Sequence, residues 1–375
     1  MTPRARLLSA LRYTGPDRIP WAPYIGGPHY QTLFPGAWRE TVRRDETDRF
    51  ASLRFAMQYH ASIGAEYTSW GTPGTYRRRQ PNVKMSRYAK GSITYEKYKT
   101  PVGTLTSESS IAVGIDGVSY PYTKKHLIES PEDMRIYTYM VEDTEVTESY
   151  AYCQDWLDEV GESGIGLSSC PPAPLKRLIL NPMSVEGVVF AIHDHRKAFD
   201  RLIEATHKLN MEIFWICANS PVTVFMEMGV SGTNMISPKI FQEYCVPYSR
   251  AYSDMLHENE KIHISLTAGE NFKGILSEIE QCGFDGIWGY QPTRERNASI
   301  ADLRAAWGNR LCTGGGMFTD CLRRGSRQEV IDMANWVLDQ VRPDDRFILS
   351  TSSIVVPGTP TENLAAVGEV VAERF

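Results

Sequence analysis

From Gly164 to the C-terminus, short apolar runs alternate with helix-like stretches of roughly 10 to 20 residues. This alternation predicts a parallel sheet, because each helix returns the chain to the same edge of the sheet. Strand-like segments begin near residues 19, 66, 165, 222, 262, 286, 310 and 347. Eight such units predict an α/β fold, a (β/α)8 TIM-type barrel.

Residues 72–122 break this rhythm. The segment alternates with a period of two, is rich in Thr, Tyr and Val, and contains the turn signals Lys90-Gly91 and Pro101-Val102-Gly103. This pattern is typical of antiparallel strands. It predicts a β-hairpin insertion after strand 2 of the barrel. Because barrels with insertions commonly exceed 250 residues, we expect one domain over residues 1–375.

The predicted helices include three long segments. Residues 133–160 are expected to be mostly helical, and residues 194–219 carry one apolar face at helical spacing. Ser237-Pro238 is a typical helix start, and that helix is expected to run to about Glu258. The turn PPAPL at residues 171–175 is expected to block a helix directly after the third strand.

Composition narrows the possible partners and location. The formal charge of -5 gives no electrostatic reason to expect a nucleic-acid partner. The N-terminus lacks an uninterrupted apolar core, and no apolar run reaches about 18 residues, so we expect a cytoplasmic protein with no membrane contact. Seven scattered cysteines without a CxxC pair predict free thiols. The oligomeric state stays open, with a homodimer as one option.

Glu227 and His263 are the main candidate functional residues. Each falls on a predicted strand, and the two strands follow one another in the barrel. We expect both side chains to converge on one cavity at the barrel mouth, where they could act in catalysis or bind a metal. The alternative is a hydrogen-bonded core histidine and a carboxylate that caps a helix or forms a salt bridge.

Further candidates lie at or just after predicted strand ends. Aromatic, amide, thioether and hydroxyl side chains there would suit a flat, ring-bearing substrate. Packing within the barrel, or for the histidine a surface loop, is the alternative. The expected substrate-binding residues are Tyr24, His29, Tyr290, Gln291, Met317 and Ser353.

Five segments in order resemble the uroporphyrinogen decarboxylase-like superfamily. They are RLLSALRYTGPDRIPW near the N-terminus, TPVGTL from Thr100, ISPKIFQEYCVPY from Ile236, GGGM from Gly314 and PGTPTENLAAV from Pro357. The resemblance implies a TIM-type barrel and one of two chemistries. One is metal-free decarboxylation of porphyrinogens. The other is zinc-dependent methyl transfer to or from a separate corrinoid protein.

The TPVGTL hairpin is closest in pattern to the corrinoid-dependent O-demethylase methyltransferases. Porphyrinogen decarboxylases carry arginine in the loop after the first strand, whereas YIGGPHYQTLFPG contains no Arg or Lys. The resemblance implies zinc at Glu227 and His263, with Ser265 and Ser353 where the thiol-methylating branch has cysteines. The position of a further acid falls at Gln242, beside Glu243, so a third ligand is not identified.

Three functions are therefore considered. The first is a zinc-assisted methyltransferase, in which an O-demethylation step moves a methyl group from a small methoxylated, aromatic substrate to a separate corrinoid protein. The chain has no DxHxxG signature, so the cobalamin is expected on that partner. The second is a metal-free decarboxylase or lyase acting on a non-porphyrin substrate. The third is a binding protein without catalysis.

Overall fold

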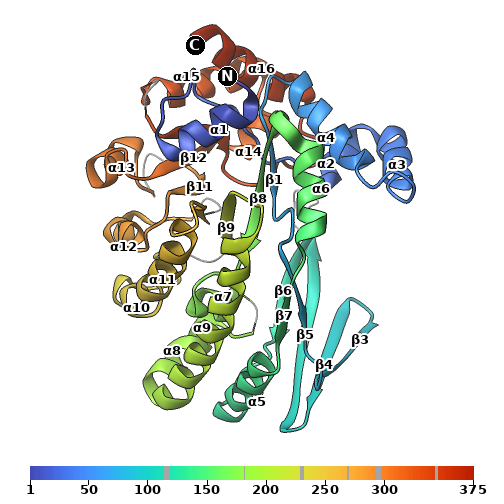
Figure 1. Ribbon diagram of the computed structural model, residues 1–375, viewed down its shortest axis with the longest axis vertical. Helices are drawn as coiled ribbons and strands as arrows, with labels where there is room; N and C mark the ends of the chain where they lie inside the picture. The colour runs from blue at the N-terminus through green and yellow to red at the C-terminus, as the bar shows by residue number, and fades with distance from the viewer. Residues whose placement is uncertain (114–118, 181, 229–231, 268–269, 293–296, 343–344) are drawn as a thin grey trace.

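A curled parallel sheet forms the centre of the molecule (Figure 1). The computed structural model describes residues 1–375 except 114–118, 181, 229–231, 268–269, 293–296 and 343–344. The strand order is β1-β8-β9-β10-β11-β12-β13, with every neighbouring pair parallel. The strands are β1 Tyr67–Trp70, β8 Gly164–Cys170, β9 Val224–Met228, β10 Ile262–Leu266, β11 Gly286–Tyr290, β12 Cys312–Met317 and β13 Phe347–Thr351.

The first predicted strand, residues 19–25, is present only as an extended segment. Trp21 forms a single parallel bridge with Leu349 of β13, and its carbonyl accepts the amide of Glu66 just before β1 at 2.8 Å. The segment thus bridges the two ends of the seven-stranded sheet. Pro20 and Pro23 lack the N–H groups that a regular ladder needs, which explains why no full strand forms here.

Helices cover the outer face of the sheet (Figure 1). Two short 3-10 helices, η1 Gly161–Ser163 and η2 Lys273–Ile275, lie between elements of the barrel. The helices are α1 Pro3–Arg12, α2 Gly27–Leu33, α3 Pro35–Arg44, α4 Ala51–Ser62, α5 Pro131–Glu142, α6 Tyr150–Val160, α7 Pro174–Leu180, α8 Val185–Asp194, α9 Arg196–Asn219, α10 Pro238–Tyr244, α11 Val246–His257, α12 Leu276–Gln281, α13 Ile300–Trp307, α14 Thr319–Arg324, α15 Arg327–Leu338 and α16 Thr361–Arg374.

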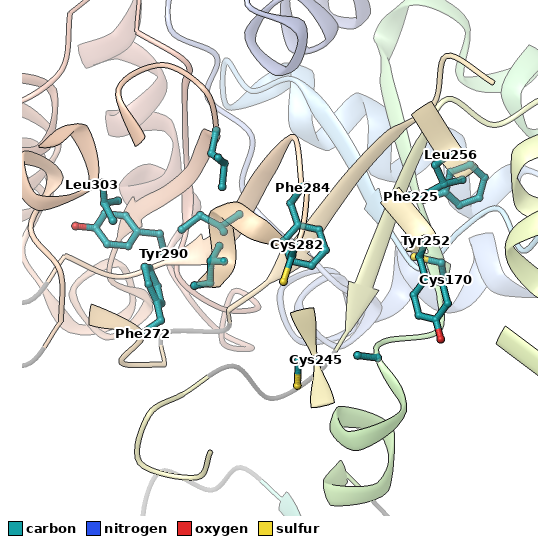
Figure 2. Packing of buried hydrophobic residues seen from close by; sticks show 14 of the residues in the cluster. Cys170, Phe225, Cys245, Tyr252, Leu256, Phe272, Cys282, Phe284, Tyr290 and Leu303 are labelled. Carbon is teal, nitrogen blue, oxygen red and sulfur yellow. The ribbon is translucent and has the colours of Figure 1, made fainter. Parts of the chain in front are cut away.

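The two faces of the sheet belong to different hydrophobic clusters. The inner cluster joins alternate strand residues, among them Val224 and Met226, to side chains of α1. The outer cluster joins the intervening strand residues to the surrounding helices. Figure 2 shows part of this outer layer, with Phe225 from β9 beside Tyr252 from α11. Both faces are apolar, as expected for a parallel sheet covered on both sides.

The insertion between β1 and β8 is larger than one hairpin. β2 (Tyr76–Arg79) pairs antiparallel with β7 (Glu145–Glu148). β3 (Lys84–Lys90), β4 (Ile93–Thr100), β5 (Gly103–Val113) and β6 (Ser119–Lys125) form a four-stranded antiparallel sheet. Figure 1 shows this sheet and α5 extending away from the end of the barrel that carries α1 and α16.

Two of the predicted helical segments and one predicted turn are corrected by the structure. Residues 133–160 contain α5 and α6 separated by β7, because the Thr- and Glu-rich stretch pairs with β2. The helix expected over residues 238–258 is divided into α10 and α11 at Cys245, where Pro247 removes an amide donor. α7 begins at Pro174 within the predicted turn, since proline is tolerated in the first turn of a helix.

All seven cysteines lie in the described part of the chain and are free, and six of them are buried. The prediction of free thiols is confirmed. Within the described residues, no helix combines the length and the apolar character needed to cross a membrane.

Candidate functional site

Glu227 lies at the end of β9 and is fully buried. Its Oε1 is 2.6 Å from the Nζ of Lys176, a fully buried residue of α7, and also accepts a hydrogen bond from Ser265 Oγ at 3.2 Å. Ser249 of α11 donates to Oε2 at 3.5 Å. Burial opposes the charge on Lys176, but the charge and hydrogen bond of Glu227, together with the nearby Cys245 and Cys282, raise the pKa of Lys176 above its ordinary value. The carboxylate is therefore held in a buried ion pair.

His263 is also fully buried, in β10. Its Nδ1 lies 2.8 Å from Ser253 Oγ of α11, and its Nε2 lies 3.6 Å from Cys170 Sγ. The imidazole packs edge-on against Phe214 and Phe284, with ring centroids 5.6 and 4.9 Å away. Burial lowers the pKa of His263 to about 3, so the ring is neutral at physiological pH.

The strand register explains the direction of both side chains. Glu227 is paired with Ser265, and His263 with Phe225, so these four residues share one face of the sheet. Their contacts with α7, α9 and α11 show that this is the outer, helix-covered face. The expectation that Glu227 and His263 open into a cavity at the barrel mouth is therefore wrong.

The residues present do not fit a zinc ion. The Glu227 oxygen that would bind the metal already contacts an ammonium group, and Ser265 supplies a hydroxyl instead of a thiolate. Gln242 and Glu243 are exposed on α10, where Gln242 donates to Gln281 and Glu243 pairs with Arg196. In the described part of the chain, no three His, Cys, Asp or Glu side chains come close enough to hold a metal.

Three of the predicted substrate-binding residues are part of the protein core. His29 is in α2, not in a loop, where its Nε2 lies 3.0 Å from the Tyr59 hydroxyl and burial lowers its pKa to about 4. Tyr290 donates to the carbonyl of Ala298 at 2.7 Å, and Met317 is fully buried in the outer cluster. Packing, the alternative stated for Tyr290 and Met317, accounts for these two side chains, whereas His29 is buried in a helix and does not lie in a surface loop.

Tyr24 belongs to an aromatic group on the inner side of the strand ends. Its ring stacks on Trp70 with centroids 3.9 Å apart and an interplanar angle of 3°. Trp70 in turn meets Trp288 edge-on at 6.4 Å, and Trp288 Nε1 donates to Ser350 Oγ at 3.0 Å. The indole Nε1 of Trp70 is buried and has no hydrogen-bond partner among the described residues, and the same holds for Thr68 Oγ1.

These two atoms leave hydrogen-bonding capacity that a water molecule or a polar ligand could satisfy. Thr68 and Trp70 are two residues apart on β1, so both side chains leave the same face of the strand. Buried donors and acceptors in native proteins nearly always have partners, from protein, water or ligand. Burial raises the pKa of Tyr24, so its phenol stays protonated at neutral pH. The aromatic group thus combines a flat surface with N–H and O–H groups.

A cavity of about 450 Å³ lies beyond the ends of β11, β12 and β13. Gln291 and Ser352 line it, together with Asp320, Cys321 and Arg324 of α14. The predicted residue Gln291 therefore faces a cavity. The predicted Ser353 is exposed and does not line it, whereas its buried neighbour Ser352, the first residue after β13, does. A hydrogen bond joins this edge to Tyr24, whose backbone amide donates to the side-chain Oγ1 of Thr351 at 3.1 Å.

Two residues that matter here were not identified from the sequence. Lys176 lies in α7, directly after the Pro-rich turn, where no sequence pattern indicates a buried ion pair. Trp70 ends a predicted strand, and strand ends carry the functional residues of barrels, so that signal was present.

Comparison with known proteins is consistent with this architecture. The model of the uroporphyrinogen decarboxylase family matches residues 107–374. A methyltransferase from Methanosarcina mazei has the same fold, with a TM-score of 0.64 and 15% identity, covering 100% of this chain and 99% of that one. The pneumococcal virulence factor StrH gives a TM-score of 0.40 and 9% identity, covering 97% and 84%. No curated protein matches the chain.

The family match covers well over half of the sequence and includes β8 to β13, which carry most of the barrel. The chain therefore belongs to the uroporphyrinogen decarboxylase family.

Proposed function

We propose that this protein is an enzyme that removes a methyl group from a small methoxylated, ring-bearing substrate and passes it to a separate corrinoid protein. Membership of the family and the full-length fold similarity to a methyltransferase support methyl transfer. The observation that carries the proposal is the stacked pair Tyr24 and Trp70, with a buried indole N–H that has no partner among the described residues.

The chain's own residues would orient the substrate and assist its leaving group. An aromatic ring can pack against the Tyr24–Trp70 pair, because offset stacking favours flat partners. The Trp70 N–H and the protonated Tyr24 phenol can donate hydrogen bonds to the ether oxygen, which gains negative charge as its bond to the methyl carbon breaks. The partner's corrinoid supplies the group that accepts the methyl. Glu227 and His263 take no direct part, since they face the helix layer.

The test is demethylation of a panel of methoxylated benzoates and phenols, with reduced cobalamin as the acceptor. The expected products are the phenol, measured by mass spectrometry, and methylcobalamin, measured by absorbance.

Trp70→Phe keeps a ring but removes the N–H, and should lower kcat by about 10- to 100-fold, as expected for one lost transition-state hydrogen bond. Trp215→Phe, at an exposed tryptophan of α9, is the matched control. Equal rates in the two variants would overturn the role of Trp70.

A metal-free decarboxylase is the second candidate, because Glu227 and His263 do not fit zinc. Chelator-treated protein distinguishes the two functions when carbon dioxide and demethylated product are measured together. Carbon dioxide release without any demethylated product would favour the decarboxylase.

A further inference from the structure

A second cavity lies outside the barrel, between the insertion and α7. Its volume is about 280 Å³, near the lower end for small-molecule sites. β2 contributes Arg78 and Arg79, α5 contributes Tyr137 and Met140, and α7 contributes Arg177. Three guanidinium groups therefore line one small space.

Arg177 has no counter-charge within the part of the chain that the structure describes. Its Nη1 is buried and has no hydrogen-bond partner among the described residues, and no ion pair of Arg177 is found there. The neighbouring residue on α7, Lys176, is the one paired with Glu227. A guanidinium has five donors, so an unmatched buried N–H is costly.

Arg78 is similarly without an acidic partner in the described structure. Its Nη2 donates to the Tyr76 hydroxyl at 3.0 Å, and its guanidinium lies 5.1 Å from the centre of that ring. Arg78 as a whole is exposed, but the cavity wall partly shields its guanidinium from solvent; this desolvation lowers the pKa of Arg78, and the positive charge of Arg177 lowers it further. Only Arg79 is neutralised, by Glu145 at 3.2 Å.

The rest of the cavity wall is largely apolar. Leu127, Met140 and Val141 supply aliphatic surface, and Tyr137 supplies an aromatic ring. Gln80 is held in place by hydrogen bonds from its Nε2 to the Met140 carbonyl at 2.7 Å and to Thr144 Oγ1 at 3.2 Å. Two unneutralised guanidinium groups beside an apolar wall suit a molecule with one anionic end and a hydrophobic body.

We propose that this cavity binds a small organic carboxylate, with its carboxylate on Arg78 and Arg177 and its body against Met140 and Val141. Guanidinium and carboxylate match in geometry and charge, so the anion would supply the missing partner of Arg177. The inference does not depend on the methyl-transfer proposal, because none of these residues belongs to the Tyr24–Trp70 group.

Calorimetric titration of the full chain with benzoate tests the proposal. Benzamide serves as the neutral analogue and inorganic phosphate as the anion without an apolar body. We expect benzoate to bind with 1:1 stoichiometry and more tightly than either. Arg177→Gln and Arg78→Gln should each weaken it by about tenfold or more. Arg77→Gln, on the same strand but not lining the cavity, is the matched control and should change affinity less than about twofold.

Several outcomes would overturn the site. They are benzoate binding no tighter than benzamide, phosphate binding as tightly as benzoate, or Arg77→Gln weakening binding as much as Arg177→Gln.

Thermal unfolding gives a second readout. Without ligand, Arg177→Met should raise Tm, because it removes an unpaired buried N–H, and it should abolish the rise in Tm that benzoate gives the wild type. A lower Tm for Arg177→Met would instead assign the guanidinium a structural role.

Discussion

Lys176 and Arg177 are neighbours on α7 but have opposite surroundings. Lys176 is fully buried on the sheet side of the helix, where Glu227 neutralises it at 2.6 Å. Arg177 lines a cavity on the insertion side, with a buried N–H that has no partner among the described residues. A buried charge that is fully paired indicates a structural role, whereas one that lacks a partner indicates a place for a ligand.

The same contrast separates the two faces of the sheet. On the outer face, Glu227 and His263 have protein partners. On the inner side, Trp70 Nε1 and Thr68 Oγ1 have none within the described chain. If this contrast holds, buried polar groups with protein partners should matter for stability, and buried polar groups without such partners should matter for ligand binding or turnover.

The largest effect is expected from breaking the buried ion pair. Lys176→Met leaves the Glu227 carboxylate buried without its cation, and should lower the free energy of unfolding by about 3–5 kcal/mol. Denaturant unfolding measures this change. The double variant Lys176→Met/Glu227→Leu should recover most of the loss, since it removes both charges. If Lys176→Met lowers the free energy of unfolding by less than about 1 kcal/mol, the Lys176–Glu227 ion pair does not have the structural role assigned to it.

A pH effect should follow from His263. Its folded-state pKa, about 3, is lower than its ordinary value of 6.5, so its contribution to stability is complete above pH 6.5 and is lost as the pH falls toward 3. The unfolded chain binds one more proton over that range, which corresponds to about 1.4 kcal/mol per pH unit. His263→Gln should reduce this slope, measured by denaturant unfolding at several pH values.

His257 provides a control of opposite sign. The hydrogen bond to Asp285 raises the pKa of His257, so its contribution is present below the ordinary pKa and is lost as the pH rises through the folded-state value. His257→Gln should therefore lower the free energy of unfolding at low pH, and this loss should disappear as the pH rises above the folded-state pKa of His257. The interpretation of His263 would be wrong if its variant showed the same sign as His257→Gln.

A smaller effect on stability is expected at the inner face. Trp70→Phe removes an N–H that has no protein partner in the described residues, so the free energy of unfolding should change by less than about 1.5 kcal/mol, although the proposed function gives Trp70 a role in turnover. Thermal and denaturant unfolding of the ligand-free variant check this. A loss comparable to that of Lys176→Met would place Trp70 with the structural residues.

The smallest effect is expected at an exposed ion pair. Arg250 and Asp254 are one helical turn apart on α11, with about half of each side chain exposed. Arg250→Gln should change the free energy of unfolding by less than about 0.5 kcal/mol, because solvent screens the pair. A much larger change would show that the contrast between buried and exposed pairs does not hold in this chain.

Much of the fold was predictable because it is encoded in local patterns. The strand–helix alternation located β8 to β13 within about two residues, and the helix start at Ser237-Pro238 was placed correctly. The first strand was harder, because its prolines leave an extended segment with a single bridge. The division at Cys245 follows from Pro247, a signal that the helical pattern obscured.

The candidate site was less predictable, because strand phase was ambiguous. Val224 and Met226 on one face are as apolar as Phe225 on the other, so hydrophobicity could not indicate which face carries Glu227. A one-residue change in phase moves a side chain from the barrel interior to the helix layer. Ser353, which was predicted, lies beyond the end of β13 and is exposed, whereas its neighbour Ser352 lines the cavity.

The sequence by itself determined the parallel α/β architecture and the family, since periodicity and motif order are properties of the chain alone. Only the tertiary structure decided which polar residues meet. The Lys176–Glu227 pair joins residues 51 positions apart, and the Arg78–Arg177 cavity joins the insertion to the barrel. Such contacts depend on how separate elements pack and on which way each strand turns its side chains, and no local pattern records either.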